Sequence, residues 1–353
     1  MTTPTGQISA NDLRNEFGST NSNGQVSLGL YRVDKTVGEL SELALDDGVP
    51  QGDSQISYSN MRGKKLNVVV DFHSGGTVDR KSARTEYDNK NVTFVGNFYT
   101  NGPNTHQSNG VPPSLGEGTK VIIHVNKKIR SEKGNKDRCA LRTGTWAGDS
   151  TVRVDVGGEG SIYGAGGNGG NGAGNENANG AAGQTGSSAL GVEHGPMTVN
   201  IRTGGYIQAG YGGGGGGGGG YNSDKNDDDL GSGGGGGGGA GQPAGSGGEG
   251  GNSWGSDGED GNAGSNTGAG EGGELGDAGE GKGGVGGDGG SIGETADDGG
   301  GGSGNNGESD GGEGGGNGSA VRRTNSSISI SYTGETDRIV GSKNNSSGNH
   351  GVA

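Results

Sequence analysis

The sequence predicts a mostly β and irregular fold. A small antiparallel β domain precedes a polyglycine II helix bundle (a glycine-rich sandwich) closed by a C-terminal strand, with little or no α-helix. Three observations predict this fold class: glycine dominates from Gly157 to Gly318, short β-branched runs precede that region, and one strand motif recurs before, within and after it. Only 24% of the residues are hydrophobic and 93 are glycine, which excludes one large apolar core.

The glycine-rich region has a three-residue period. Outside two oligoglycine tracts, 212–220 and 233–239, glycine falls on every third position, as in Gly255, Gly258, Gly261 and Gly264. A threefold helix with glycine along one side lets backbones approach as in collagen, but Pro243 is the last proline of this chain. Such a helix has no internal hydrogen bonds, so it is stable only where many segments pack side by side. We therefore expect an ordered polyglycine II bundle rather than a flexible glycine linker.

Residues 65–156 are the part that resembles an ordinary folded domain. Three of its segments are rich in β-branched and aromatic residues and are separated by glycine- and asparagine-rich turns: 66–72, 91–99 and 120–125. No helical periodicity is present in this part. We expect a small antiparallel β domain.

An internal repeat links this domain to the glycine-rich region. A strand of alternating pattern that leads into a glycine run occurs at 151–156, at 198–203 and, more faintly, at 327–332. We expect these strands to pair at the base of the bundle. The predicted organisation is an N-terminal attachment segment (1–64), the β domain (65–156), the bundle with exposed loops (157–320) and a C-terminal strand and tail (321–353).

The N-terminal segment is polar, with two short patterned stretches. In the first, Ser9 can cap one or two helical turns that end at Phe17, because Leu13 and Phe17 lie four residues apart on one face. The second surrounds Met61. Neither stretch could form a core alone, so the sequence favours a segment that docks on a partner.

The first stretch resembles a motif of virion proteins from contractile-tailed bacteriophages, especially T-even-type and marine cyanobacterial phages. The motif is carried by Ile8, Ser9, Asp12, Leu13, Arg14, Glu16, Phe17 and Gly18, then by Val26, Ser27, Leu28, Tyr31 and Arg32, and the second stretch is similar through Ile56, Ser57, Met61, Arg62, Gly63 and Lys64. The candidate attachment residues are Ile8, Leu13, Arg14, Phe17, Tyr31, Arg32, Met61 and Arg62.

With a glycine-rich body behind this motif, the chain resembles the tail-fibre tip adhesins of such phages. The resemblance implies a non-enzymatic virion protein that residues 1–65 attach to a phage fibre or tail protein, and whose bundle loops bind a host surface protein or glycan. Two alternatives stay open: a structural virion protein (fibre, neck, baseplate or capsid decoration) that binds only other phage proteins, and, more remotely, an ice-binding protein.

The candidate receptor contacts are large or charged residues that interrupt the glycine runs. Rigid aromatic side chains at loop ends are common recognition anchors, and the bundle interior offers them no room. The candidates are Tyr211, Tyr221, Asp224, Lys225, Asp227, Asp228, Asp229 and Trp254. An equally open interpretation is that the aromatics cover the sides or ends of the bundle.

Charge and motif spacing exclude several other functions. A net charge of −15 argues against nucleic acid and anionic membranes as partners, and no apolar run is long enough to insert in a membrane. The N-terminus lacks the pattern of a signal peptide. The acidic run 224–229 fails the EF-hand spacing, the histidines and Cys139 show no metal-binding spacing, and glycine motifs lack the helix that a nucleotide site needs. We expect no cofactor, no metal and no catalytic site.

Overall fold

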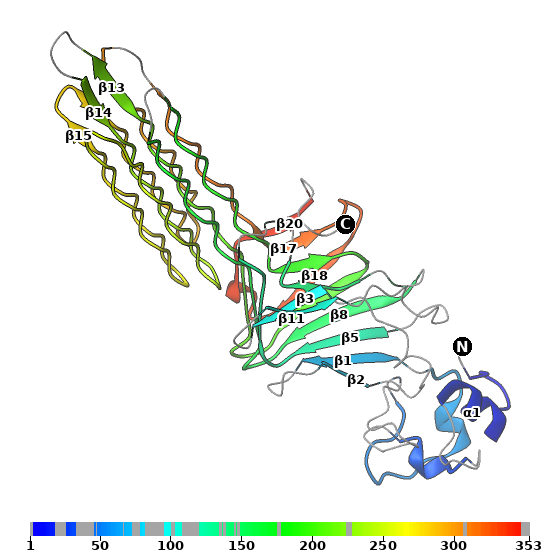
Figure 1. Cartoon of the computed structure of the whole chain (residues 1–353). Helices are drawn as coiled ribbons and strands as arrows, with labels where there is room; N and C mark the ends of the chain where they lie inside the picture. Colours follow the sequence, from blue (N-terminus) through cyan, green and yellow to red (C-terminus); the bar gives the residue numbers. More distant parts are fainter. Residues whose placement is uncertain are drawn as a thin grey trace.

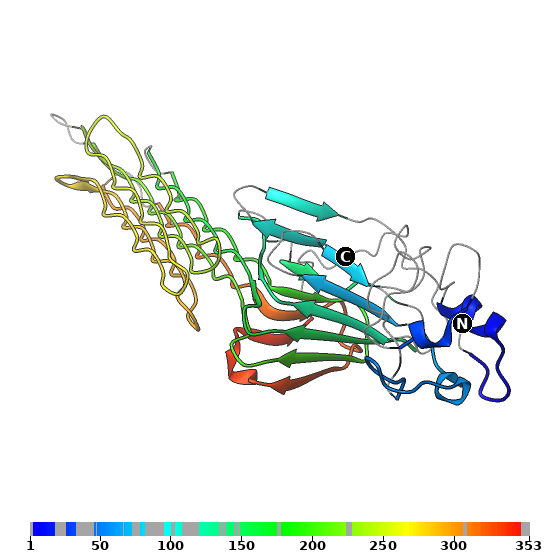
Figure 2. The same cartoon turned by 90° about the horizontal axis from the view of Figure 1, so that it is seen from below.

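The computed structural model spans residues 1–353 and describes 3–17, 26–32, 46, 48–65, 67–72, 78–81, 95–99, 103–107, 120–133, 136, 139–144, 146, 149–174, 178–223, 228–305 and 309–346. A small helical segment, a block of β-sheets and a long glycine-rich bundle follow one another (Figure 1), and Figure 2 shows the bundle on the side away from the N-terminal segment. The prediction of mostly strands with almost no helix is confirmed, because α1 (Ala10–Phe17) is the one α-helix of these residues.

The β-sheets form a three-sided parallel solenoid. Each coil gives one strand to each of three sheets, whose strand orders are β18-β11-β8-β5-β1-β2, β19-β12-β9-β6 and β20-β17-β10-β7. The coils, in chain order, are β5 (Lys120–Val125), β6 (Lys128–Arg130) and β7 (Leu141–Arg142); β8 (Thr151–Val156), β9 (Ser161–Tyr163) and β10 (Leu190–Val192); β11 (Met197–Ile201), β12 (Tyr206–Gln208) and β17 (Ser319–Arg323); and β18 (Ile330–Gly334), β19 (Ile339–Val340) and β20 (Ser342–Asn345). The predicted pairing of the repeated strands is confirmed, since β11 lies between β8 and β18.

Ladders of apolar side chains fill the solenoid. β5 and β11 alternate between buried and half-buried residues, which is the period of a strand with one covered face. Ile129, Ile162 and Ile207 lie side by side with no exposed surface, and Ile339 extends the row. Burying such a side chain contributes about 1.5–3 kcal/mol. Because a slip of one residue would turn the isoleucines outward, the ladder fixes the register of the coils.

The expected small antiparallel β domain is wrong in strand direction. β1 (Val68–Phe72) pairs in parallel with β5, and β5 pairs in parallel with β8. Antiparallel pairing in this part is found where β1 meets β2 (Val78–Lys81) and where β3 (Val95–Tyr99) meets β4 (Pro103–Gln107). An alternating pattern shows that one face is covered, but it does not encode the direction of the neighbouring strand.

The bundle is an insertion in the solenoid rather than a sequel to it. The chain leaves the second coil between β9 and β10, and leaves the third coil between β12 and β17. Because β8, β11 and β18 share one sheet, the solenoid crosses the expected boundaries at 156/157 and 320/321. We propose that the solenoid and its inserted bundle, rather than segments in chain order, are the structural units of residues 120–346.

The bundle consists of extended segments, called rods here, that run alternately away from the solenoid and back. They are residues 164–174, 178–188, 210–220, 231–241, 244–252, 257–264, 269–276, 283–290, 296–304 and 310–318. Two short hairpins connect rods at the far end: β13 (Gly220–Ser223) with β14 (Asp228–Gly231), and β15 (Asp277–Ala278) with β16 (Gly281–Lys282).

Hydrogen bonds between rods follow a period of three residues. In rod 231–241, the Gly236 N–H donates to Gly170 O (2.8 Å), the Gly237 N–H to Gly287 O (2.9 Å) and the Gly238 N–H to Asn262 O (2.8 Å), and each acceptor lies on a different rod. Gly239 returns to the first of these rods, at Gly167 O. This pattern is the one that the polyglycine II interpretation requires, since such a helix has no bonds of its own.

Glycine density follows how many sides of a rod are covered. In the oligoglycine tract of rod 231–241, a Cβ added at Gly233, Gly234 or Gly235 would lie 1.9–2.1 Å from a backbone oxygen of a different neighbouring rod. In rod 257–264 glycine recurs only at every third residue, and each of these glycines faces rod 231–241. The two oligoglycine tracts are therefore the central rods, and the sequences with one or two glycines per triplet are peripheral.

Peripheral rods use asparagine and aspartate side chains as hydrogen-bond acceptors. Asn168 Oδ1 accepts from the Ser246 N–H (2.9 Å), Asp260 Oδ1 from the Gly250 N–H (2.8 Å), and Asp288 Oδ1 from an N–H of rod 269–276 (2.8 Å). These side chains supply acceptors where a further rod would otherwise lie, so the outer backbone N–H groups stay paired.

Candidate functional site

The end of the bundle farthest from the solenoid gathers loops from four parts of the chain. This end, called the tip here, consists of residues 221–230, 253–256, 277–282 and 303–309, as far as they are described. Figure 1 shows β13, β14 and β15 together at this end. The tip is a candidate contact surface, because it is the part of the bundle whose side chains are not constrained by the spacing of the rods.

Side-chain hydrogen bonds hold the tip loops to one another. Asn222 Nδ2 donates to Glu280 Oε2 (3.0 Å), and Asn222 Oδ1 accepts from the Asn305 N–H (3.3 Å). Asn305 Oδ1 in turn accepts from the Ser223 N–H (3.1 Å). The Ser256 N–H donates to Leu230 O (3.0 Å), which ties the loop of Trp254 to β14. The loops therefore form one preorganised surface, which lowers the entropy cost of binding.

Trp254 is the most exposed large apolar side chain among the described residues, with 65% of its surface accessible. Tyr221 lies at intermediate exposure at the start of the β13–β14 hairpin. Asp229 Oδ2 accepts from the Glu280 N–H (3.3 Å), so this candidate supports a neighbouring loop as well as carrying charge. The hydrogen bond from Lys282 Nζ to Asp277 (3.1 Å), together with one from a backbone N–H, holds the pKa of Asp277 below its usual value.

The predicted contact residues do not all lie at the tip. Tyr211 is 2% exposed and packs with Ala209, Ala240 and Ile292 near the solenoid, so its expected exposure is wrong. It lies at the start of a central rod, where a large side chain fits beside the last turns of the bundle. Asp224, Lys225 and Asp227 lie outside the described residues, and Asp228 is described only as a backbone partner of Ser223 in β14.

Several predicted attachment residues form an internal core instead of a contact surface. Ile8, Leu13, Phe17, Tyr31 and Met61 are buried, and the rings of Phe17 and Tyr31 lie 5.8 Å apart. The two patterned stretches of the N-terminal segment pack on one another, a contact that could not be predicted from either stretch alone. The expected Ser9 cap is confirmed, since Ser9 Oγ accepts from the Asp12 N–H (3.3 Å). The Ser9 hydroxyl and N–H in turn donate to the Asp12 carboxylate (2.7 Å each) and hold the pKa of Asp12 below its usual value.

The exposed face of the N-terminal segment carries different residues. Arg14 and Arg62 are exposed and Arg32 is half-buried. Leu30, in η1 (Leu28–Leu30), and Tyr58, in η2 (Tyr58–Met61), are exposed apolar residues that sequence reasoning did not select. Leu30 directly precedes the buried Tyr31, and Tyr58 lies one turn before the buried Met61; these spacings are the signal that could have identified them. Burial raises the pKa of Tyr31 to about 12, with Tyr58 adding to the rise and Arg14 opposing it.

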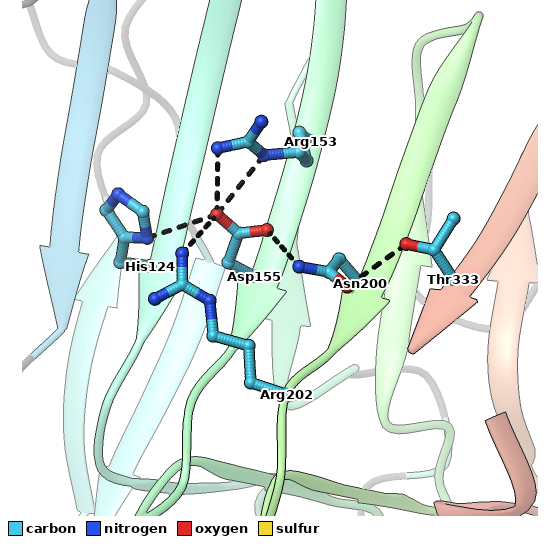
Figure 3. A network of polar contacts seen from close by, with 6 residues as sticks. All are labelled: His124, Arg153, Asp155, Asn200, Arg202 and Thr333. Atoms are coloured by element: carbon cyan, nitrogen blue, oxygen red, sulfur yellow. Dashed lines mark hydrogen bonds and ion pairs between the residues drawn. The ribbon is translucent and has the colours of Figure 1, made fainter. Parts of the chain in front are cut away.

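A polar network on the outer face of the solenoid was the other candidate for a site (Figure 3). The buried carboxylate of Asp155 lies 3.3 Å from His124 Nδ1, and its oxygens accept from Arg153, Arg202 and Asn200 at 3.0–3.2 Å. His124, Asp155, Asn200 and Thr333 are register partners on four neighbouring strands. The network therefore joins neighbouring coils of the solenoid, and the Asp155 carboxylate already has donors at both of its oxygens.

Among the described residues, no group of three or more histidine, cysteine, aspartate or glutamate side chains is arranged to hold a metal ion. In the same residues, no helix has both the length and the apolar character needed to cross a bilayer.

The fold and the tip define a class: a parallel β-solenoid protein that presents a cluster of surface loops at the end of an inserted glycine-rich bundle. The chain belongs to the phage tail fibre adhesin Gp38 family, whose model matches residues 89–344. This membership identifies a non-enzymatic protein of the virion tail fibre. The match covers the four coils of the solenoid as far as residue 344 and the whole bundle, and it leaves out residues 1–88, with β1 and β2, and residues 345–353.

Among solved structures, the chain is similar to the gp37–gp38 adhesin tip complex of the bacteriophage S16 long tail fibre. The identity is 21% and the TM-score 0.26, over 61% of this chain and 68% of that chain. The comparison with curated proteins gave no match.

Proposed function

We propose that the tip binds a receptor on the surface of the host cell, a protein or a glycan. The observation that carries the proposal is the exposure of Trp254 on a preorganised loop cluster at the far end of the bundle. A tryptophan whose ring is exposed on the protein surface is a typical anchor for binding a partner. The family membership supports the adhesive role.

We also propose that the N-terminal segment attaches the chain to a phage fibre or tail protein. The resemblance of residues 1–65 to virion proteins supports this, and so does their place on the side of the solenoid away from the bundle (Figure 2). Leu30 and Tyr58 are the contacts that we assign, with Arg14 and Arg62 as charged contacts, because these side chains are exposed. The large apolar residues of the motif, Leu13, Phe17, Tyr31 and Met61, are buried.

The test is binding of purified protein to whole cells of candidate host bacteria. Trp254→Ala is expected to weaken binding about tenfold or more, since hot-spot aromatics contribute about 2 kcal/mol or more. A chain whose 221–230 hairpin is replaced by glycine and serine is expected to lose binding. Val285→Ala is the matched control, because Val285 is also an exposed apolar residue (48%) but lies on rod 283–290 rather than in a tip loop.

The outcomes separate the two parts of the proposal. If both tip variants fold, by circular dichroism, and bind like the wild type, the tip is not the receptor site. If the folded wild type binds no candidate cell, a virion role that involves only phage proteins is favoured. Leu30→Ser with Tyr58→Ala should prevent assembly onto fibres and leave cell binding unchanged; normal assembly would refute the attachment surface.

A further inference from the structure

One face of the solenoid carries a row of tyrosine and basic side chains that belongs neither to the tip nor to the N-terminal segment. On the outer face of sheet β19-β12-β9-β6 lie Lys128 of β6, Tyr163 of β9, Tyr206 of β12 and Arg338 just before β19. We call these residues the tyrosine row. Two aromatic rings occupy its centre, and a cation stands at each end.

The contacts within the row are direct. The ring centroids of Tyr163 and Tyr206 lie 5.7 Å apart with an interplanar angle of 45°, and Lys128 Nζ lies 5.6 Å from the Tyr163 centroid. The pKa of Tyr206 is raised, first by burial and then by Tyr163 and Tyr211, while the nearby Arg338 guanidinium opposes the rise. Arg338 Nε also donates to Glu335 Oε2 (2.7 Å), which fixes its position.

The solenoid holds the row rigidly. The isoleucine ladder beneath it sets the register of the same strands, so each side chain of the row has one place on the face. Neighbouring strands lie about 4.8 Å apart, so the row spans about 14 Å across its coils. Both tyrosines are half-buried, and Lys128 and Arg338 are exposed, which leaves ring surface and positive charge available to a ligand.

We propose that the tyrosine row is a second binding surface, for a negatively charged saccharide chain. Aromatic rings offer flat apolar surface to the C–H faces of sugar rings, and the two cations complement carboxylate or phosphate groups along the chain. The positive charge of the row contrasts with the net charge of the whole protein, which is −15. The surface lies on the solenoid, apart from the tip, and therefore goes beyond the receptor site proposed above.

An acidic peptide fits this face less well. The backbone groups of the inner strands β9 and β12 are used within the sheet, so a peptide lying across the face could form no β-ladder. It would gain charge contacts without a partner for the tyrosine rings, whereas a saccharide ring uses both features of the row.

The experiment measures binding of the full chain by titration calorimetry, with hexagalacturonate as the probe. Maltohexaose is the neutral saccharide and hexaglutamate the acidic peptide. The expected result is binding of hexagalacturonate that weakens with salt, with the other two ligands at least about tenfold weaker. Tyr163→Ala with Tyr206→Ala, and separately Lys128→Glu, should each weaken binding about tenfold or more.

Two controls keep the result specific. Lys343→Glu is matched to Lys128→Glu, because Lys343 Nζ also lies over a tyrosine ring, that of Tyr332 (5.8 Å), but outside the tyrosine row; its binding should be unchanged. Trp254→Ala should also bind normally, which separates this surface from the tip. Lys128 is exposed, so its variant is expected to fold even if the double tyrosine variant does not.

Three results would overturn the proposal. They are no binding of hexagalacturonate by the folded wild type, undiminished binding by the Lys128 variant, and equal binding of hexaglutamate. The last result would assign the surface to an acidic protein partner. None of these results depends on whether the tip binds cells.

Discussion

A single methyl group in a central rod is expected to disrupt the bundle. Gly236 lies in rod 231–241, and a Cβ added there would stand 2.1 Å from the carbonyl oxygen and 2.6 Å from the carbonyl carbon of Gly214 on the next rod. Both atoms belong to backbone, so no side-chain rotation can relieve the overlap. Gly236→Ala must therefore push two hydrogen-bonded rods apart.

The magnitude follows from the bonds that cross this contact. The Gly214 N–H donates to Gly237 O, the Gly217 N–H to Gly234 O and the Tyr211 N–H to Ala240 O, each at 2.8 Å. Weakening two or three such bonds costs about 0.5–1.5 kcal/mol each. Overpacking a tight interior adds about 1–3 kcal/mol. The expected loss of unfolding free energy is about 2–7 kcal/mol.

The assay is urea unfolding followed by tryptophan fluorescence, in which Trp254 reports on the bundle and buried Trp146 on the solenoid. Gly316→Ala is the matched control, because its Cβ would meet only the Thr185 side chain, at an ordinary 3.8 Å. Its expected effect is within about 0.5 kcal/mol of zero or slightly stabilising. Equal effects of the two substitutions would refute the close packing of rods described above.

Three further predictions concern single side chains. Burial raises the pKa of the Cys139 thiol to about 12, so iodoacetamide at pH 8 should modify it at least about a hundredfold more slowly in folded protein than in urea; equal rates would contradict its burial. The pKa of Asp277 is lowered, so its contribution to the β15–β16 hairpin is present above pH 3.8 and is lost as pH falls below that value; an NMR titration midpoint at or above 3.8 would contradict this. Asp288→Ala should cost about 0.5–1.5 kcal/mol in urea unfolding, because the Gly272 N–H loses its acceptor, whereas Asp288→Asn keeps an acceptor and should be nearly neutral.

Much of the architecture was predictable because glycine spacing is a steric signal. A residue that faces another backbone at about 2 Å from its missing Cβ can only be glycine, so the period of three and the recurrent strand were legible without a structure. The number of glycines per triplet also indicates how many sides of a rod are covered. This number can be read from the sequence, but its meaning became clear only from the packing of the rods in the structure. The direction of the strands was not encoded, since parallel and antiparallel strands with one covered face share the same alternation.

The candidate site was predicted less completely, for reasons of packing. Trp254 lies exposed in a loop between rods, as expected. Tyr211 instead is covered by a later turn of the bundle that includes Ile292, and the sequence alone does not indicate a contact between residues so far apart in the chain. In the N-terminal segment, Leu13 and Phe17 were identified as one helical face, yet their partner is the second stretch of the same segment rather than another protein. Exposed residues beside such a core are visible only once the core is assembled.

The solenoid explains how a bundle with no apolar core finds its arrangement. Each coil turns the same corner, so insertions at one corner of successive coils leave the solenoid side by side. At that corner the Ala165 N–H donates to the hydroxyls of Ser131 and Ser187 (2.7 Å each), and the Gly210 N–H donates to Ser187 O (3.0 Å). The solenoid ends of rods 164–174, 178–188 and 210–220 are thus paired at this corner. Because the rods start in register there and hold one another by backbone bonds, the loops at the tip can change sequence without disturbing what positions them.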